Sequence, residues 1–141
     1  MTRTQHGAAA VEFVILLPAM LLVVAAVVGG ARIWFARATT QQVADSAARA
    51  ASLARDPASA QHDARRVAQS DLASARLSCV RGPGITVDTA GFAVPVGQPA
   101  SVGVGVRCDV ALGDLVVPGL PGVFTVEASG SSTLDRYRGR R

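Results

Sequence analysis

Residues 6–32 of the chain read HGAAAVEFVILLPAMLLVVAAVVGGAR. Within this stretch, residues 13–31 form a run of 19 residues without a formally charged side chain. A helix over this run spans roughly 28 Å at about 1.5 Å per residue, which is close to the ~30 Å hydrocarbon core of a bilayer. The run therefore predicts a membrane-spanning helix, and one carboxylate, Glu12, lies just before its start.

The apolar run favours a retained anchor over a cleaved secretory signal. The apolar region of a signal peptide is usually ~7–15 residues long and ends at a small-residue cleavage site. Here the run is longer, and Arg32 and Arg37 follow it while the helical pattern continues. We expect a single membrane-spanning helix that extends beyond the lipid.

Composition limits the other classes of protein. The 141 residues suffice for one domain of ordinary size, half of them are hydrophobic, only 4% are aromatic, and the mean hydropathy is +0.34. The net charge is +4, and all 14 basic residues are arginine. Four arginines crowd into residues 136–141, which we interpret as a basic tail, and the other ten are scattered among acidic residues with no regular interleaving of aromatic residues. This pattern argues against nucleic-acid binding.

A second helix is expected after the first. Apolar residues recur at helical spacing to about Arg55, and Asp56-Pro57 ends that helix because the residue before proline disfavours helical backbone. Ala58-Ser59 opens an amphipathic helix that runs to near Cys79. Its apolar stripe consists of Ala60, Ala64, Val67, Ala68, Leu72 and Ala75.

The remaining chain favours strands. Strand candidates are residues 85–88, 92–94, 101–112 and 123–129. Residues 115–122 form a hydrophobic turn that could cover the sheet or touch lipid or a partner, and the chain from Gly130 onward is expected to be loose. The sequence therefore predicts an α+β fold with a small antiparallel sheet of three to four strands.

The best strand candidate places a cysteine in the core. In residues 101–112 the valines and Cys108 fall on one face, while Gly103, Gly105, Arg107 and Asp109 fall on the other. Cys79 could meet Cys108 there in a disulfide, provided that the domain is exported to an oxidising compartment. Two buried free thiols are the alternative.

The sequence does not decide on which side of the membrane the C-terminal part of the chain lies. Arg3 stands alone before the apolar run, whereas several arginines follow it. The positive-inside rule would therefore place the C-terminal part in the cytoplasm, and the cysteine pair argues for the opposite side.

No catalytic or metal-binding motif is present. The spacings CxxC, HxxxH, GxxxxGK[ST], GxGxxG and GxSxG are absent. His62 and Asp63 are adjacent on the second helix, so we expect their side chains to diverge. We expect no enzymatic activity, no cofactor, no metal and no small-molecule substrate.

The segment Gly7-Ala8-Ala9-Ala10-Val11-Glu12-Phe13 resembles a prepilin-type processing site: a short polar leader, then glycine, four residues, glutamate, an aromatic residue and a long apolar helix. From Gly7 to about Leu53 the chain resembles the TadE-like family of pilus-assembly proteins. These are minor pilins or pseudopilins of the tight-adherence (Flp pilus) secretion system. The first mature residue would be alanine, where type IV pilins often have phenylalanine.

The resemblance implies a pilin-like arrangement and a set of roles. A prepilin peptidase would cleave after Gly7 at the cytoplasmic face and leave Ala8 as the new N-terminus. The C-terminal domain would lie outside the cytoplasm, which agrees with the cysteine argument. Glu12, beside Phe13, would pair with the terminal amine of a neighbouring subunit, since a carboxylate near the hydrocarbon edge is stabilised by a cation there.

These expectations divide the chain into a leader (1–7), a membrane helix with its extension (8–55), an extracytoplasmic α+β domain (56–135) and a basic tail (136–141). The expected partners are membrane lipid, the prepilin peptidase, other pilins or pseudopilins, and pilus-assembly platform proteins. Two alternatives are a single-pass extracellular binding module unrelated to pili and a regulator that faces the cytoplasm.

Overall fold

The structure, a computed structural model, describes residues 6–111, 122–137 and 139. Within the first helix, it describes side chains at residues 13 and 14 and from residue 16 onward. The hydrophobic turn predicted at residues 115–122 lies outside the described residues except for Gly122, as does part of the basic tail.

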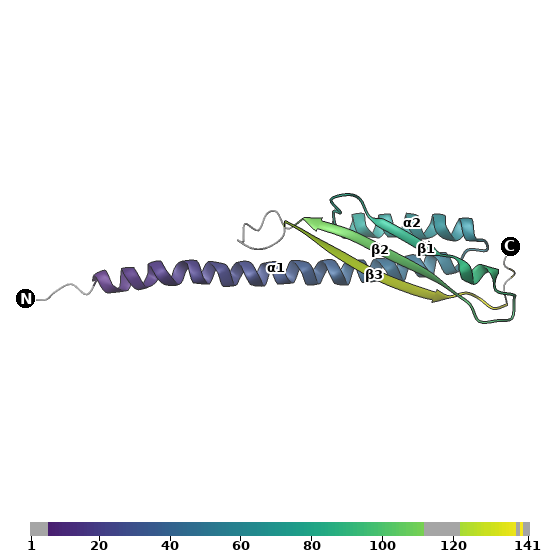
Figure 1. Ribbon diagram of the computed structural model, residues 1–141, viewed down its shortest axis with the longest axis horizontal. Coiled ribbons are helices and arrows are strands. Elements are labelled where there is room, and N and C mark those ends of the chain that lie inside the picture. The colour runs from purple at the N-terminus through teal and green to yellow at the C-terminus, as the bar shows by residue number, and fades with distance from the viewer. Residues whose placement is uncertain (1–5, 112–121, 138, 140–141) are drawn as a thin grey trace, which may run out of the picture.

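One helix runs through both halves of the molecule (Figure 1). Helix α1 (His6–Ser52) is continuous through Pro18, and its N-terminal half projects away from the rest of the chain. Its C-terminal half packs on the sheet, where Ala36, Thr40, Val43 and Ala44 are buried. The predicted long apolar helix, with an extension that packs on the rest of the chain, is confirmed.

Helix α2 (Pro57–Ser74) returns along α1 after a short turn. Asp56 is its N-cap and accepts a hydrogen bond of 2.8 Å from the Ser59 backbone N–H, while Pro57 occupies the first turn, where its missing N–H is not needed. The helix therefore begins slightly before the predicted Ala58-Ser59 start.

The predicted end of the second helix, near Cys79, was wrong. Arg76 adopts a left-handed backbone with φ of 53°, and the Leu77 N–H donates to the Leu72 carbonyl at 3.1 Å. The Arg76 N–H donates to the Ala73 carbonyl at 3.1 Å. Together these bonds form a Schellman motif, which ends the helix at Ser74 although no glycine marks the position.

Three strands form one antiparallel sheet in the order β1-β2-β3. They are β1 (Gly84–Asp88), β2 (Ser101–Ala111) and β3 (Val123–Thr133). The central strand pairs over its full length with β3, from Ser101 opposite Thr133 to Ala111 opposite Val123. With the two helices this sheet confirms the α+β class.

Two strand predictions need correction. Residues 92–94 are not a strand, because the Asp88 carboxylate accepts the Ala90 N–H at 2.9 Å and turns the chain into a short 3-10 helix, η1 (Ala90–Ala93), which buries Phe92. The chain from Gly130 is not loose either, because β3 continues to Thr133 and its backbone pairs with β2.

The core lies between one face of the sheet and the two helices. Helix α1 covers β2 and β3, and α2 packs beside it toward β1. The helices contribute mostly alanine, and the central strand contributes three buried valines, at Val102, Val104 and Val106. The predicted inward face of residues 101–112, with Cys108, is confirmed over the described residues.

Candidate functional site

The projecting half of α1 is an apolar surface. Between residues 13 and 28, every large apolar side chain that the structure describes is exposed, and Phe13 is 67% exposed. Within the described part of the chain, this is the one helix that is long and apolar enough to cross a membrane. A projecting apolar helix of this length fits a single-pass membrane anchor.

The predicted processing and pairing residues lie at the beginning of this helix. Gly7, Ala8 and Glu12 belong to the first turns of α1, and their side chains are outside those that the structure describes. Phe13 follows on the exposed surface. The roles of these residues stay predictions.

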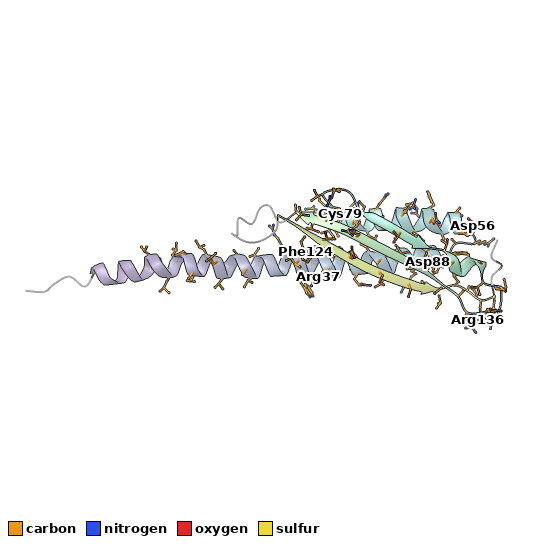
Figure 2. All side chains as sticks on the ribbon, in the orientation of Figure 1. Arg37, Asp56, Cys79, Asp88, Phe124 and Arg136 are labelled. Carbon is orange, nitrogen blue, oxygen red and sulfur yellow. A yellow bond between two sulfur atoms is a disulfide. The ribbon has the colours of Figure 1, made fainter. Side chains whose placement is uncertain are left out.

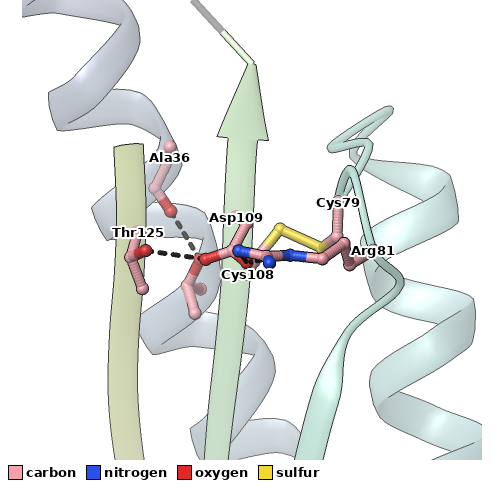
Figure 3. Close-up of a disulfide and its surroundings, with 7 residues drawn as sticks. Ala36, Cys79, Arg81, Cys108, Asp109 and Thr125 are labelled. Atoms are coloured by element: carbon pink, nitrogen blue, oxygen red, sulfur yellow. Dashed lines mark hydrogen bonds and ion pairs between the residues drawn. A yellow bond between two sulfur atoms is a disulfide. The ribbon is translucent and has the colours of Figure 1, made fainter. Parts of the chain in front are cut away.

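Cys79 and Cys108 form a disulfide (Figure 3). The Cα atoms of the two residues are 5.1 Å apart, within the usual range for this bond. Cys79 also forms a backbone bridge with Val110, so the segment after α2 lies alongside the central strand. The bond therefore ties the α2–β1 connection to β2.

An ionic network lies beside the disulfide, on the other face of β2 (Figure 3). Asp109 accepts hydrogen bonds from the Arg81 guanidinium, at 2.9 and 3.1 Å, and from the Thr125 hydroxyl at 2.7 Å. The Thr125 hydroxyl, followed by Arg81, holds the pKa of the Asp109 carboxyl below its ordinary value of 3.8. Only 8% of Asp109 is exposed, although its strand position faces away from the helices.

Sequence reasoning missed this network. Asp109 was expected on the outer face with Arg107, and it is there, but Arg81 and Thr125 cover it. The partners are 28 and 16 residues away in the chain. Only the pairing of Asp109 with Thr125 in the β2–β3 register could have suggested the contact.

Strand β3 runs along α1 away from the projecting half. In Figure 2, Arg37, Phe124 and Cys79 lie at the end of the domain near the projecting helix, and Asp56 and Arg136 lie at the far end. Three contacts follow this direction: Arg37 over the Phe124 ring at 5.3 Å, Gln41 Nε2 to the Ser129 carbonyl at 2.9 Å, and Ser132 Oγ to Ser52 Oγ at 3.0 Å. The disulfide and Asp109 therefore lie at the end of the domain nearer the apolar half.

The comparison with protein families concerns the same helix. The family model described as TadE-like protein matches residues 7–49, which cover nearly all of α1, both its projecting and its packed parts. This match supports membership of the TadE-like family. No significant match was found among curated proteins or among solved structures.

The described part of the chain holds no group of three or more His, Cys, Asp or Glu side chains that could bind a metal ion. The expected divergence of His62 and Asp63 was wrong, since His62 Nδ1 lies 3.4 Å from Asp63 Oδ1. Both side chains are exposed, which leaves them free to lean toward each other around the helix, and Arg66 lies 3.6 Å from the same carboxylate. This is a solvated surface contact of small energetic weight.

Proposed function

We propose that this TadE-like chain is a membrane-anchored minor pilin or pseudopilin that acts in the assembly of a Flp, or tight-adherence, pilus. The observation that carries the proposal is the family match over α1, whose exposed half is available to lipid and to other helices. The protein works by packing against other subunits and has no enzymatic activity. Its partners are other pilins or pseudopilins and the proteins of the assembly platform.

The N-terminal segment supplies the residues for processing and pairing. A prepilin peptidase cleaves between Gly7 and Ala8 at the cytoplasmic face. The Glu12 carboxylate then pairs with the N-terminal amine of a neighbouring subunit, and Phe13 packs against the neighbouring helices. The low dielectric at the hydrocarbon edge strengthens such an ion pair.

The α+β domain lies on the extracytoplasmic side in this proposal. The Cys79–Cys108 disulfide supports that side, because structural disulfides persist in oxidising compartments. Labelling intact cells with a membrane-impermeant thiol reagent, before and after an external reductant, tests the orientation. Labelling that appears only after external reduction supports it, and labelling that requires cell lysis contradicts it.

Processing is tested by the intact mass of the membrane-extracted protein from cells with and without the prepilin peptidase. We expect residues 1–7 to be lost only when the peptidase is present, and a Gly7→Leu variant to keep them. If residues 1–7 remain in cells that contain an active peptidase, the pilin assignment loses its main support. The single-pass binding module is then the better reading.

Pairing is tested with Glu12→Gln. We expect this variant to insert into the membrane normally and to co-purify less with the major pilin, because the amide cannot neutralise a terminal amine. Glu127→Gln is the matched control, since Glu127 is an exposed carboxylate on the domain, paired with Arg107 at 2.8 Å. Equal co-purification of both variants with the major pilin would make Glu12 a boundary residue only.

A further inference from the structure

Exposed apolar and cationic side chains gather where α1 joins the domain. On the helix, Trp34 is 71% exposed and Phe35 is also exposed. On the sheet, Val123 at the start of β3 is 44% exposed, and the next residue, Phe124, lies under the Arg37 guanidinium. We call Trp34, Phe35, Arg37, Val123 and Phe124 the collar.

The position of the collar along the helix axis follows from the charge-free run. Residue 31 is the last residue before Arg32, so it marks the end of the hydrocarbon-spanning part. At about 1.5 Å per residue, Trp34 lies about 4.5 Å beyond it and Arg37 about 9 Å beyond it. The headgroup layer on each side of a bilayer is roughly 5–8 Å thick. Trp34 therefore falls within that layer, and the Arg37 backbone falls just beyond its outer boundary.

One end of the sheet lies at the same position along the α1 axis as Arg37. The contact between Arg37 and Phe124 places the first residues of β3 at the same height along the α1 axis as Arg37. Val123, the first of them, pairs with Ala111, the last residue of β2. From there β3 leads away from the membrane, to the contact between Ser132 and Ser52. One end of the sheet, rather than its face, thus lies toward the projecting apolar half of α1 (Figure 2).

We propose that the collar docks this end of the domain onto the headgroup layer of the bilayer, so that the sheet stands upright on the membrane. Continuity with the membrane-spanning helix argues for lipid as the occupant, because the collar begins where the hydrocarbon ends. Indole rings favour this interface, and arginine near the surface attracts anionic headgroups. A groove between α1 and β3, lined in part by Trp34, Arg37, Gln41 and Glu127, opens beside the guanidinium. The inference rests on the membrane anchor and is independent of the role in pili.

The first test uses the native chain, whose single tryptophan is Trp34. The full-length protein is reconstituted into vesicles that contain lipids brominated either near the headgroup or near the bilayer centre. We expect a loss of Trp34 fluorescence that is greater with the shallow quencher, together with emission at shorter wavelength than that of hydrated tryptophan. Stronger quenching by the deep bromines, or no quenching by either lipid, would overturn the placement.

The second test separates the sheet from the helix. In a Trp34→Phe background, a new tryptophan is placed at Val123 or at Thr133, two exposed positions at opposite ends of β3. They are ten residues apart on the same face of the strand, which is about 34 Å. We expect lipid quenching of Val123→Trp and none of Thr133→Trp. Equal quenching of both tryptophans would mean that the domain lies flat on the membrane. No quenching of either would mean that the domain does not contact the bilayer. Each of these results would overturn the proposed docking.

The third test concerns charge. Vesicles of phosphatidylcholine are compared with vesicles that also contain phosphatidylglycerol, and quenching of Val123→Trp is expected to increase with the anionic lipid. Arg37→Gln should remove this increase, whereas Arg136→Gln, at the far end of the domain, should leave it intact. If Arg37→Gln and Arg136→Gln behave alike, Arg37 does not hold the headgroups. Resistance of all variants to alkaline carbonate extraction verifies insertion, and loss of insertion in the native chain would overturn both the anchor and the collar.

Discussion

A Cβ atom added to Gly130 of β3 would lie 2.5 Å from the carbonyl oxygen of Ala44 in α1. The strand therefore rests directly on the helix backbone at this point, without a side chain between them. Gln41, one turn earlier, donates a hydrogen bond to the carbonyl of Ser129, the neighbour of Gly130. This close approach fixes the position of the sheet along the α1 axis. It therefore also fixes the distance between the domain and the apolar half of the helix.

We expect Gly130→Ala to destabilise the domain, because the helix backbone cannot yield as a flexible side chain would. Overpacking of this kind costs typically about 1–3 kcal/mol. For a domain of this size, each kcal/mol lowers Tm by roughly 4–8 °C. Thermal unfolding of the full-length protein in detergent, followed by circular dichroism, measures the change. The matched control is Gly103→Ala in β2, where the new Cβ would meet the Asp88 Cβ at an ordinary 3.6 Å. Equal Tm values for the two variants would contradict this account.

Reduction of the Cys79–Cys108 bond should lower stability substantially. The bond joins residues 29 apart in sequence, and closure of a loop of this length restricts the unfolded chain by about 3–4 kcal/mol in the chain-entropy model. We expect a Tm lower by more than ten degrees after treatment with a reductant, or in the Cys79→Ser, Cys108→Ser double variant, given roughly 4–8 °C per kcal/mol. The reductant should leave the double variant unchanged. An unchanged Tm of the reduced native chain would show that the bond does not constrain it.

The long periodic elements could be predicted from sequence because each carries its pattern over many residues. The apolar run before Arg32 and the alternation of residues 101–112 need no knowledge of distant parts of the chain. Their residues are buried or exposed as the pattern requires, with Cys108 buried among the valines and Phe13 exposed. The family resemblance came from the same segment that the family model matches.

The features that the sequence did not predict lack such a local signal. Arg76 ends α2 in a left-handed conformation that glycine or asparagine would have signalled and arginine does not. Residues 130–133 carry glycine and small polar side chains that favour a loop, yet β2 supplies the hydrogen bonds that hold them in β3. Asp109 gained its partners from two distant segments. For residues 130–133 and for Asp109, tertiary contacts rather than local preference decided the outcome.

The contact between α1 and α2 is built from alanine, and its tolerance for larger side chains should be low. Ala48 and Ala51 of α1 and Ala60 and Ala64 of α2 are fully buried in one cluster. We expect Ala64→Leu to lower the free energy of unfolding by about 1–3 kcal/mol, because helices packed through small side chains leave no space for added carbons. Ala73→Leu is the control, since Ala73 is exposed on the same helix and leucine is a good helix former. Comparable Tm values for the two variants would contradict tight packing here.

Asp109 should make stability depend on pH in the acid range. Because its pKa is lowered in the folded protein, its contribution is present above the unfolded value of about 3.9 and is lost as pH falls through the folded value. We expect Asp109→Asn to have a lower Tm than the native chain at neutral pH, and the difference to shrink below about pH 4. A difference that stays constant across this range would show that the Asp109 ionisation is not linked to folding.

The Thr125 hydroxyl is the largest cause of the Asp109 shift, ahead of Arg81, so it can be tested separately. Thr125→Val removes the donor at 2.7 Å and keeps the branched shape, whereas Thr125→Ser keeps the hydroxyl. We therefore expect the fall of Tm between about pH 5 and pH 2 to become shallower in Thr125→Val than in Thr125→Ser, because the native carboxylate loses its main stabilising partner. The pKa of Asp56 is also lowered, chiefly by the Ser59 backbone N–H. Asp56 therefore contributes equally, in both variants, to the fall of Tm with decreasing pH. Identical slopes in the two variants would assign the effect to Arg81 instead.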